Sequence, residues 1–236
     1  MKPQYLLILL LSVWSGLSGF TARYNVKSLG LRVAKLDLGI DTHLQEIRIK
    51  AKSTRYGSIM GRLDNSYQIR YDALIRPKRY LRNVNQQKIA YSVQTEYDHP
   101  ASRAEMNDPG TGAKKSFSIH PDTRDVFSFL AYCSMAKPSP GLYPIDANGV
   151  LWYADLRGGA KTEVNTYLGK MAAYKYRLTF MKSGRATTPY IDMITFNLVN
   201  ADTSMDLWIS ERGVPLKAKV AKKSNSMTWE LESLKE

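Results

Sequence analysis

Residues 43–51 read HLQEIRIKA, and this stretch decides the fold class. After Leu44, which departs from the phase, the apolar residues fall on one face of an extended chain and the basic residues on the other: Ile47, Ile49 and Ala51 against Arg48 and Lys50. A period of two is typical of a half-buried β-strand, because successive side chains of a strand point to opposite faces. We therefore predict a strand with one face toward a core and one toward water.

The same pattern recurs along most of the chain and predicts a mainly β protein. The further predicted strands cover residues 67–71, 89–95, 150–154, 174–180, 191–199, 205–209, 214–220 and 227–231. Turn signals separate the later strands at Asn148-Gly149, Gly158-Gly159, Ser183-Gly184 and Arg212-Gly213. Short strands with tight turns predict an antiparallel meander curled into an open or closed barrel, which hides the sheet edges. Residues 98–115, rich in Pro, Gly, Asn and Asp, predict a long surface loop.

One segment, Asp122 to Ser134, has helical spacing instead. Its apolar residues recur at i, i+3, i+4 and i+7: Val126, Phe129, Leu130 and Cys133. Asp122 or Thr123 can cap the start, and Asp125 places an acid in the first turn. We expect one central helix, lying against the barrel mouth or in its concave face. Phe127, Leu130 and Tyr132 are then candidate ligand-binding residues of an internal cavity, with ordinary core packing as the alternative.

The N-terminus has the three-part pattern of a secretory signal peptide over residues 1–19. Lys2 gives a positive start, residues 5–14 (YLLILLLSVW) form an apolar run, and Ser15 to Gly19 supply small residues for cleavage. The run is too short to cross a bilayer, which needs about 20 apolar residues. We therefore expect cleavage, export to the periplasm, and a single β-barrel-like domain over residues 20–236 that is not an integral membrane protein.

The mature chain would carry a strong positive charge, since the whole chain has 34 Lys and Arg against 21 Asp and Glu, a formal net charge of +13. After export, nucleic acid is not an expected partner, whereas lipid head groups and acidic envelope polymers are. Two basic strips are candidates for such an anionic contact: Arg76, Lys78 and Arg82, and Lys217, Lys219 and Lys223. The alternative for both is a solvated strand face.

Residues for catalysis or metal binding are sparse. The chain has one cysteine, Cys133, within an apolar stretch that predicts a packed, inert thiol. The histidines His43, His99 and His120 have no metal-ligand spacing, and no G-x-S-x-G nucleophile motif occurs. We expect no enzymatic activity, no metal and no cofactor.

Several short motifs together resemble a family of exported bacterial proteins catalogued as a domain of unknown function. Residues 24–30 (YNVKSLG) and 33–36 (VAKL) look like its opening strands, and Asp125-Val-Phe-Ser128 with Leu130 looks like its Asp-x-x-Ser-x-Leu helix start. Residues 169–174 (GKMAAY) and 207–210 (LWIS) with Val214-Pro215 resemble its later hairpins. The resemblance implies an antiparallel, curled sheet, related at the level of fold to the periplasmic lipoprotein carriers, whose open barrel and helix hold acyl chains.

These features together lead to a functional hypothesis. We expect a non-enzymatic periplasmic binding protein for a lipid, a glycolipid or an acylated partner, held in the concave face. The alternatives are a structural or accessory subunit of a cell-envelope complex and a hydrolase acting on envelope polymers. Any two strands of a barrel can bring a pair of carboxylates together, so the hydrolase stays open at this point.

Overall fold

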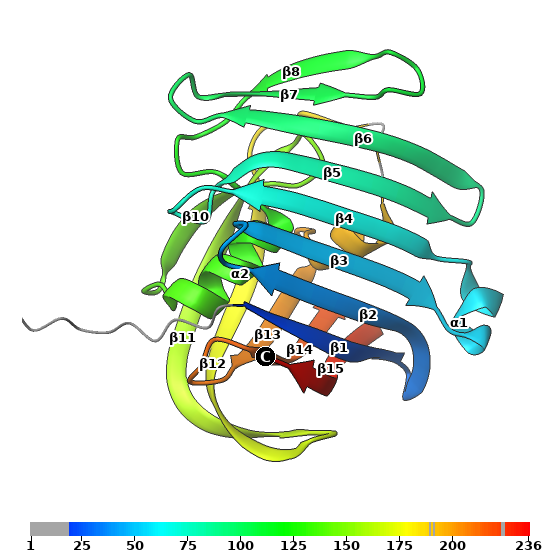
Figure 1. The fold of residues 1–236 in the computed structure, drawn as a ribbon, viewed down its shortest axis with the longest axis vertical. Coiled ribbons are helices and arrows are strands. Elements are labelled where there is room, and N and C mark those ends of the chain that lie inside the picture. The colour runs from blue at the N-terminus through cyan, green and yellow to red at the C-terminus, as the bar shows by residue number, and fades with distance from the viewer. Residues whose placement is uncertain (1–18, 189, 191, 223–224) are drawn as a thin grey trace, which may run out of the picture.

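The computed structural model describes residues 19–188, 190, 192–222 and 225–236, which form one curled sheet of fifteen strands together with three helices (Figure 1). The strands of the first half are β1 (Gly19–Ser28), β2 (Leu31–Asp41), β3 (Glu46–Ser53), β4 (Asp64–Tyr71), β5 (Pro77–Gln86), β6 (Ile89–Asp98), β7 (Arg103–Asn107) and β8 (Lys114–Ser118). Those of the second half are β9 (Arg124–Asp125), β10 (Gly141–Asp146), β11 (Leu151–Thr166), β12 (Gly169–Lys182), β13 (Thr203–Ile209), β14 (Pro215–Lys222) and β15 (Asn225–Lys235). The helices are α1 (Arg55–Met60), α2 (Val126–Ala136) and α3 (Met193–Leu198).

The strand order gives the sheet two meanders that meet at the chain termini. It runs β8-β7-β6-β5-β4-β3-β2-β1-β15-β14-β13-β12-β11-β10-β9, so that the first and last strands pair with each other in the middle. All pairs are antiparallel except β9 with β10. The sheet curls but does not close, and α2 lies in its concave side (Figure 1). The predicted fold class, a mainly β open barrel with a helix, is confirmed.

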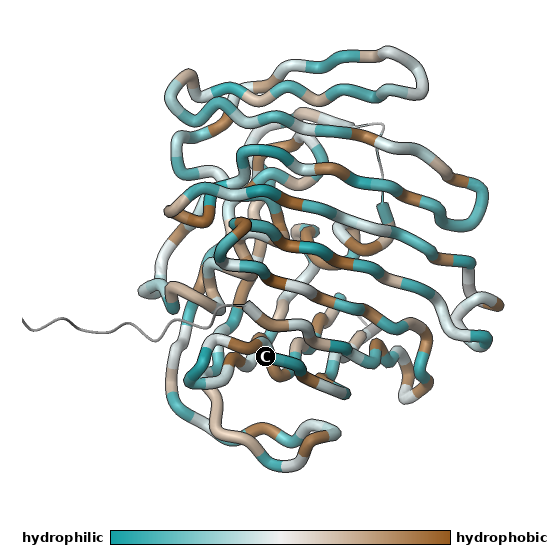
Figure 2. The backbone as a smooth tube through the Cα atoms, viewed as in Figure 1, coloured by the Kyte–Doolittle hydropathy of each residue, from teal (hydrophilic) through white to brown (hydrophobic). Residues whose placement is uncertain are grey.

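The core lies on the concave face because the strands keep their period-two pattern. In β4 the side chains of Tyr67, Ile69 and Tyr71 are buried, whereas Arg70 is exposed. Figure 2 shows this alternation of hydrophobic and hydrophilic residues along the neighbouring strands. One face of each strand is thus removed from water, and apolar burial is the main force that holds such a sheet together.

The pair Gly158-Gly159 does not make the predicted turn between strands. Both glycines lie inside β11, at a bulge where its register with β12 shifts. Their φ angles of 96° and 97° are in the left-handed region, and a Cβ atom on Gly158 would come 2.7 Å from the carbonyl oxygen of Lys175. Only glycine fits there, and such bulges bend a strand. The β11–β12 hairpin consequently curls beneath β1 and β15, as Figure 1 shows.

Three other predicted elements differ from the structure. The central helix begins at Val126 rather than near Asp122, because Asp125 is its N-cap and not a residue of its first turn. Residues 98–115 are not one loop, since they contain β7 and the start of β8. Residues 191–199 were predicted as a strand, yet residues 193–198 form α3. Asp192 caps that helix, and tertiary packing of its short apolar run overrides the strand preference.

The predicted signal peptide falls almost wholly outside the described residues, which begin at Gly19. Gly19 is the first residue of β1 and is opposite Asp41 of β2. Cleavage of residues 1–19 from the rest of the chain stays a prediction.

Candidate functional site

The concave face holds an apolar cavity of about 60 Å³ against α2. Its walls come from strands on both sides of the β1–β15 junction and from the helix, and include Leu38, Ile49, Leu207, Ala218, Phe127 and Leu130. Lys217 and Ser134 are also among its lining residues. The Lys217 ammonium group donates to the carbonyl oxygen of Asn165 at 3.4 Å. This cavity is therefore small and bounded almost entirely by hydrocarbon.

A larger cavity, of about 470 Å³, continues along the same concave face. It lies between α1 and α3 and is lined by residues that include Val26, Ala51, Gly57, Ile194, Val220 and Met227. Leu36 and Trp229 line both cavities, so the two spaces lie end to end along the inner face of the sheet. The few polar residues of the larger cavity are Ser28, Ser53, Asn197 and Lys222. Such a lining favours an elongated apolar ligand over a charged one.

Helix α2 is fixed in the concave face by a buried N-cap. The Asp125 carboxylate accepts hydrogen bonds from the backbone N–H groups of Phe127 at 2.9 Å and Ser128 at 3.2 Å, and also from the Ser128 hydroxyl. Asp125 is fully buried, and burial raises the pKa of its carboxyl to about 6. The Asp-x-x-Ser part of the motif therefore serves to start the helix, and the helix in turn positions Phe127 and Leu130 at the cavity wall.

The three predicted ligand-binding residues do not lie together. Phe127 is buried, lines the smaller cavity and packs on Tyr67 with ring centroids 4.8 Å apart. Leu130 is half-buried and lines the same cavity. Tyr132 lines neither cavity: the Arg124 guanidinium lies 3.8 Å from its ring centroid, and Tyr143 packs edge-on against it. The predicted place of Tyr132 in the ligand pocket is therefore corrected.

The first basic strip is not a continuous surface. Lys78 is exposed and Arg76 is half-buried, with its guanidinium 2.7 Å from the Asp72 carboxylate. Arg82 has an exposed fraction of 0%, so the surface position predicted for it is wrong. Along β5 the side chains of Tyr80, Arg82 and Val84 point into the core, and charge alone does not reveal that direction.

The second basic strip is also divided. Lys219 is exposed on β14, as predicted. Lys217 is half-buried and contributes to the smaller cavity. Lys223 lies outside the described residues. Contact of Arg76, Lys78, Lys217 and Lys219 with an anionic partner stays a prediction.

A buried polar network that the sequence reasoning missed surrounds Arg82. Its guanidinium donates to the Asn148 side-chain oxygen, and the Asn148 amide donates to Thr195 Oγ1 at 2.6 Å. The Thr195 hydroxyl and the Tyr67 hydroxyl, at 2.7 and 2.8 Å, both donate to the Asp192 carboxylate. Burial, with the nearby charge of Asp192, raises the pKa of Tyr67 well above its ordinary value. The network ties β5 to α3, which forms one wall of the larger cavity.

The sequence predictions for metal ligands, the cysteine and membrane-spanning helices can be compared with the described residues. No three His, Cys, Asp or Glu side chains in that part of the chain are grouped as a metal ion would need. Cys133 is fully buried, and burial raises the pKa of its thiol to about 12, so the predicted packed thiol is confirmed. None of the helices in the same ranges combines the length and apolar character that crossing a membrane requires.

Comparison with solved structures supports the fold. The chain matches no protein-family model and no curated protein sequence. It is similar to a β-barrel-like protein of the domain of unknown function DUF1849 from Brucella abortus, with a TM-score of 0.62 at 8% identity, over 93% of this chain and 98% of the other. The resemblance drawn from the sequence motifs, to a bacterial domain of unknown function with a curled sheet, is confirmed at the level of fold.

Two further structures are more distant. One is described as an exported protein with a YmcC-like fold from Bacteroides fragilis, with a TM-score of 0.37 at 9% identity over 94% of this chain and 97% of the other. The other is described as a lipoprotein from Parabacteroides distasonis, with a TM-score of 0.36 at 8% identity over 92% and 95%.

Proposed function

We propose that the protein is a non-enzymatic binding protein, exported to the periplasm, that holds an acyl chain of a lipid, a glycolipid or an acylated partner. The observation that carries the proposal is the pair of apolar cavities that share Leu36 and Trp229. The signal-peptide pattern of residues 1–19 supports the location.

The size and the lining of the cavities support an acyl chain over a compact polar ligand. The larger cavity, about 470 Å³, lies within the roughly 300–1,000 Å³ of small-molecule sites. Each methylene group moved from water into such surroundings contributes about 0.8 kcal/mol. A polar head group would find few hydrogen-bond partners inside, where the polar lining residues are Ser28, Ser53, Asn197 and Lys222, so we expect it to stay at the mouth of the larger cavity.

The first test is chemical identification of what the protein carries. Organic extraction of the purified protein, followed by mass spectrometry, is expected to yield an amphiphile with an acyl chain. A fluorescent fatty acid should bind in solution, and Trp229 emission should change because its indole lines both cavities. Trp229→Phe is the control that assigns the signal.

A space-filling variant makes the test specific to the cavity. Ala51 is buried in the wall of the larger cavity, so Ala51→Phe should weaken fatty-acid binding at least about tenfold, by occupying the space. Ala90→Phe is the matched control, since Ala90 is exposed on β6. Equal binding by both variants, or no binding by the unmodified protein, would contradict the proposal.

An accessory subunit of an envelope complex is the second candidate, and one observation favours it. Within the described residues the sheet ends at β8, which pairs only with β7 and leaves one edge of its backbone without a strand. Exposed edges are templates for a partner strand, although Lys114 and Lys115 on this edge oppose indiscriminate pairing. Native mass spectrometry separates the candidates, because a co-purified protein instead of an amphiphile favours the accessory subunit.

A further inference from the structure

The larger cavity lies at one end of the sheet, and that end is apolar on its outside as well. It comprises the β1–β2 turn, α1 and the β5–β6 turn, and we call it the open end. The lining residues of the cavity include Gly57 of α1, the C-cap Gly61, and Ser28 and Val33 beside the β1–β2 turn. The exposed large apolar residues of this end are Leu29, Leu31, Tyr56, Ile59 and Ile89. Ile59 and Leu29 are 81% and 75% exposed.

The position of α1 is fixed by contacts that leave these apolar side chains outside. The Thr54 hydroxyl accepts a hydrogen bond from the Gly57 N–H at 3.1 Å and donates to the carbonyl oxygen of Arg32 at 2.7 Å. Gly57 packs so closely on β2 that a Cβ atom there would come 1.8 Å from the Val33 carbonyl oxygen. The helix therefore cannot rotate Tyr56 and Ile59 inward without losing these contacts.

The β1–β2 turn also holds an apolar side chain, that of Leu29, in an exposed position. Ser28 is opposite Leu31, so Leu29 and Gly30 form a two-residue turn, with φ angles of 50° and 80°. Positive φ at both positions is typical of turns that favour Asn-Gly, because a branched or bulky side chain is strained there. Leu29 is thus held at a positive φ with its side chain 75% exposed.

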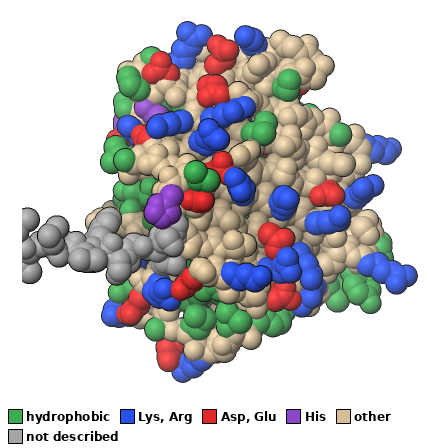
Figure 3. Space-filling view, in the orientation of Figure 1, with side chains coloured by type: hydrophobic (Ala, Val, Ile, Leu, Met, Phe, Trp, Pro, Cys, Tyr) green, Lys and Arg blue, Asp and Glu red, His purple; other side chains and the backbone are tan. Residues whose placement is uncertain are grey.

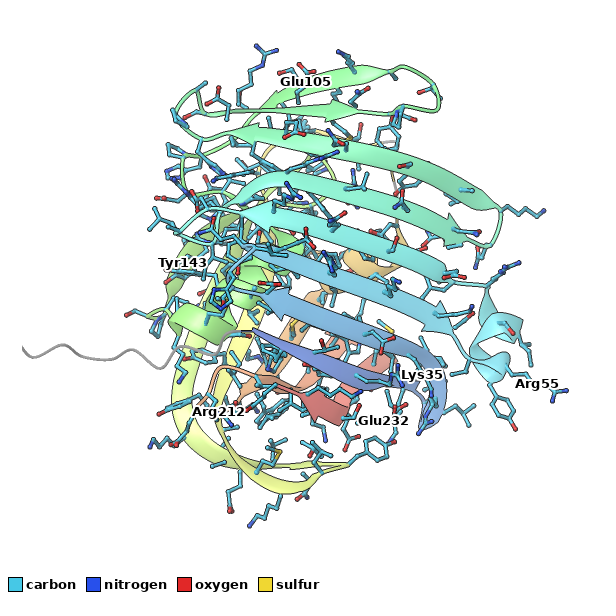
Figure 4. All side chains as sticks on the ribbon, viewed as in Figure 1. Lys35, Arg55, Glu105, Tyr143, Arg212 and Glu232 are labelled. Carbon is cyan, nitrogen blue, oxygen red and sulfur yellow. The ribbon has the colours of Figure 1, made fainter. Side chains whose placement is uncertain are left out.

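Positive charge accompanies this apolar surface. Arg55, Arg62 and Lys88 are exposed and make no ion pair with a carboxylate of the described residues, whereas Arg32 and Lys52 of the same end pair with Glu232 and Asp64. Figure 4 shows Arg55 extending away from α1, and Figure 3 shows hydrophobic side chains beside Lys and Arg at this end of the molecule. Lys222, which lines the cavity, lies 4.0 Å from the ring centroid of Phe196.

We propose that the open end is the surface by which the protein docks on an anionic phospholipid bilayer, and that acyl chains enter the larger cavity there. Apolar side chains next to unpaired cations suit a bilayer interface, where the former enter the acyl boundary and the latter meet phosphates. This inference rests on the proposed acyl-binding function, because it makes the cavity mouth the site of exchange. An isolated apolar patch could contact a protein or a membrane equally well. The neighbouring cations are what favour an anionic bilayer.

Vesicle flotation tests the docking surface. The purified protein should float with phosphatidylcholine vesicles that contain phosphatidylglycerol, more weakly with phosphatidylcholine alone, and less at high salt because exposed charges are screened. Arg55→Ala/Arg62→Ala/Lys88→Ala should weaken association about 100-fold, and Tyr56→Ala/Ile59→Ala about tenfold. The matched control is Leu44→Ala/Leu74→Ala, exposed leucines at the opposite end of the same strands, which should bind as the unmodified protein does.

Fatty-acid binding in solution, measured on the same variants, separates the two proposals. Intact fatty-acid binding with lost flotation is the expected result for the open-end variants. Flotation that is absent in the unmodified protein, or equal in open-end and control variants, overturns the docking surface while fatty-acid binding upholds the cavity. Association with a protein instead of vesicles overturns it as well. An unmodified protein that does not bind the fatty acid overturns the proposed function of the cavity itself.

Discussion

The two ends of the curled sheet differ in how the charged side chains at their turns are paired. The end opposite the open end, which we call the closed end, carries the turns at residues 41–46 and 72–76 and the start of α2. There Arg76 pairs with Asp72 at 2.7 Å, and Arg124 donates to the Leu74 carbonyl oxygen at the same distance while lying over Tyr132. At the open end, Arg32 and Lys52 pair with Glu232 and Asp64. Arg55, Arg62 and Lys88 make no ion pair with a described carboxylate, and Ile59 is 81% exposed.

This difference separates what folding requires from what a partner requires. Matched charges and satisfied caps at the closed end are explained by the stability of the chain alone. Exposed leucines and a φ of 50° also occur at the closed end, at Leu44, Leu74 and Gln45. The open end differs because it combines three unpaired cations with exposed apolar side chains beside the larger cavity, and this combination points to contact with something outside the chain. The predictions below test this contrast, beginning with the largest expected effect.

The strongest contrast is between the two helix caps. Asp125→Ala at the closed end should lower the free energy of unfolding by about 3 kcal/mol, because it removes a cap and leaves buried N–H groups without acceptors. Thr54→Ala at the open end removes a half-buried cap and should cost only about 1 kcal/mol. Urea unfolding followed by circular dichroism measures both. Equal losses at the two caps would remove the energetic distinction between the ends.

The ionisation of Asp125 gives a second test of the closed end. Its pKa is raised from 3.8 to about 6 in the folded protein, so protonation favours the folded state. The stabilisation is complete below about pH 4 and is lost as pH rises through about 6, an effect of up to about 3 kcal/mol. Asp125→Asn should abolish this component, which is read from unfolding free energies of both proteins between pH 4 and pH 7. Parallel pH profiles would show that Asp125 is not the group responsible.

Helix α2, which starts at the closed end, was more predictable from the sequence than α1 at the open end. The helical spacing around Val126 and Phe129 predicted α2, and the period-two alternation predicted most strands, because both patterns come from the burial of one face. The open end gave little signal, since α1 is six residues long and is set by the close approach of Gly57 to Val33. Long-range packing of this kind has no local pattern.

The cavities and the buried charge were unpredictable for a related reason. The bulge that bends β11 lies at Gly158, which in the sequence looks like an ordinary turn. Strand alternation puts Tyr80, Arg82 and Val84 on one face of β5, but the sequence does not indicate that this face is the inner one, because a guanidinium is rarely buried. The Arg82 partners Asn148 and Met106 are far away in the sequence, and the Tyr80 ring lies 5.4 Å from the guanidinium, so the contacts that accompany this burial have no local sequence pattern.

The smallest expected effect on stability comes from a substitution at Leu29 that should raise stability and weaken vesicle binding at the same time. Leu29→Asn at the open end should raise the free energy of unfolding by about 0.5 kcal/mol, because Asn tolerates a φ of 50° better than Leu in a two-residue hairpin turn. The same change should weaken flotation with anionic vesicles about tenfold, because it removes an exposed leucine from the docking surface. Gln45→Asn is the matched control, since Gln45 has the same φ of 50° at the closed end. It should give a similar gain in stability without a change in flotation. A variant Leu29→Asn that loses stability would show that Leu29 packs against the fold, and its exposure would then say nothing about a membrane.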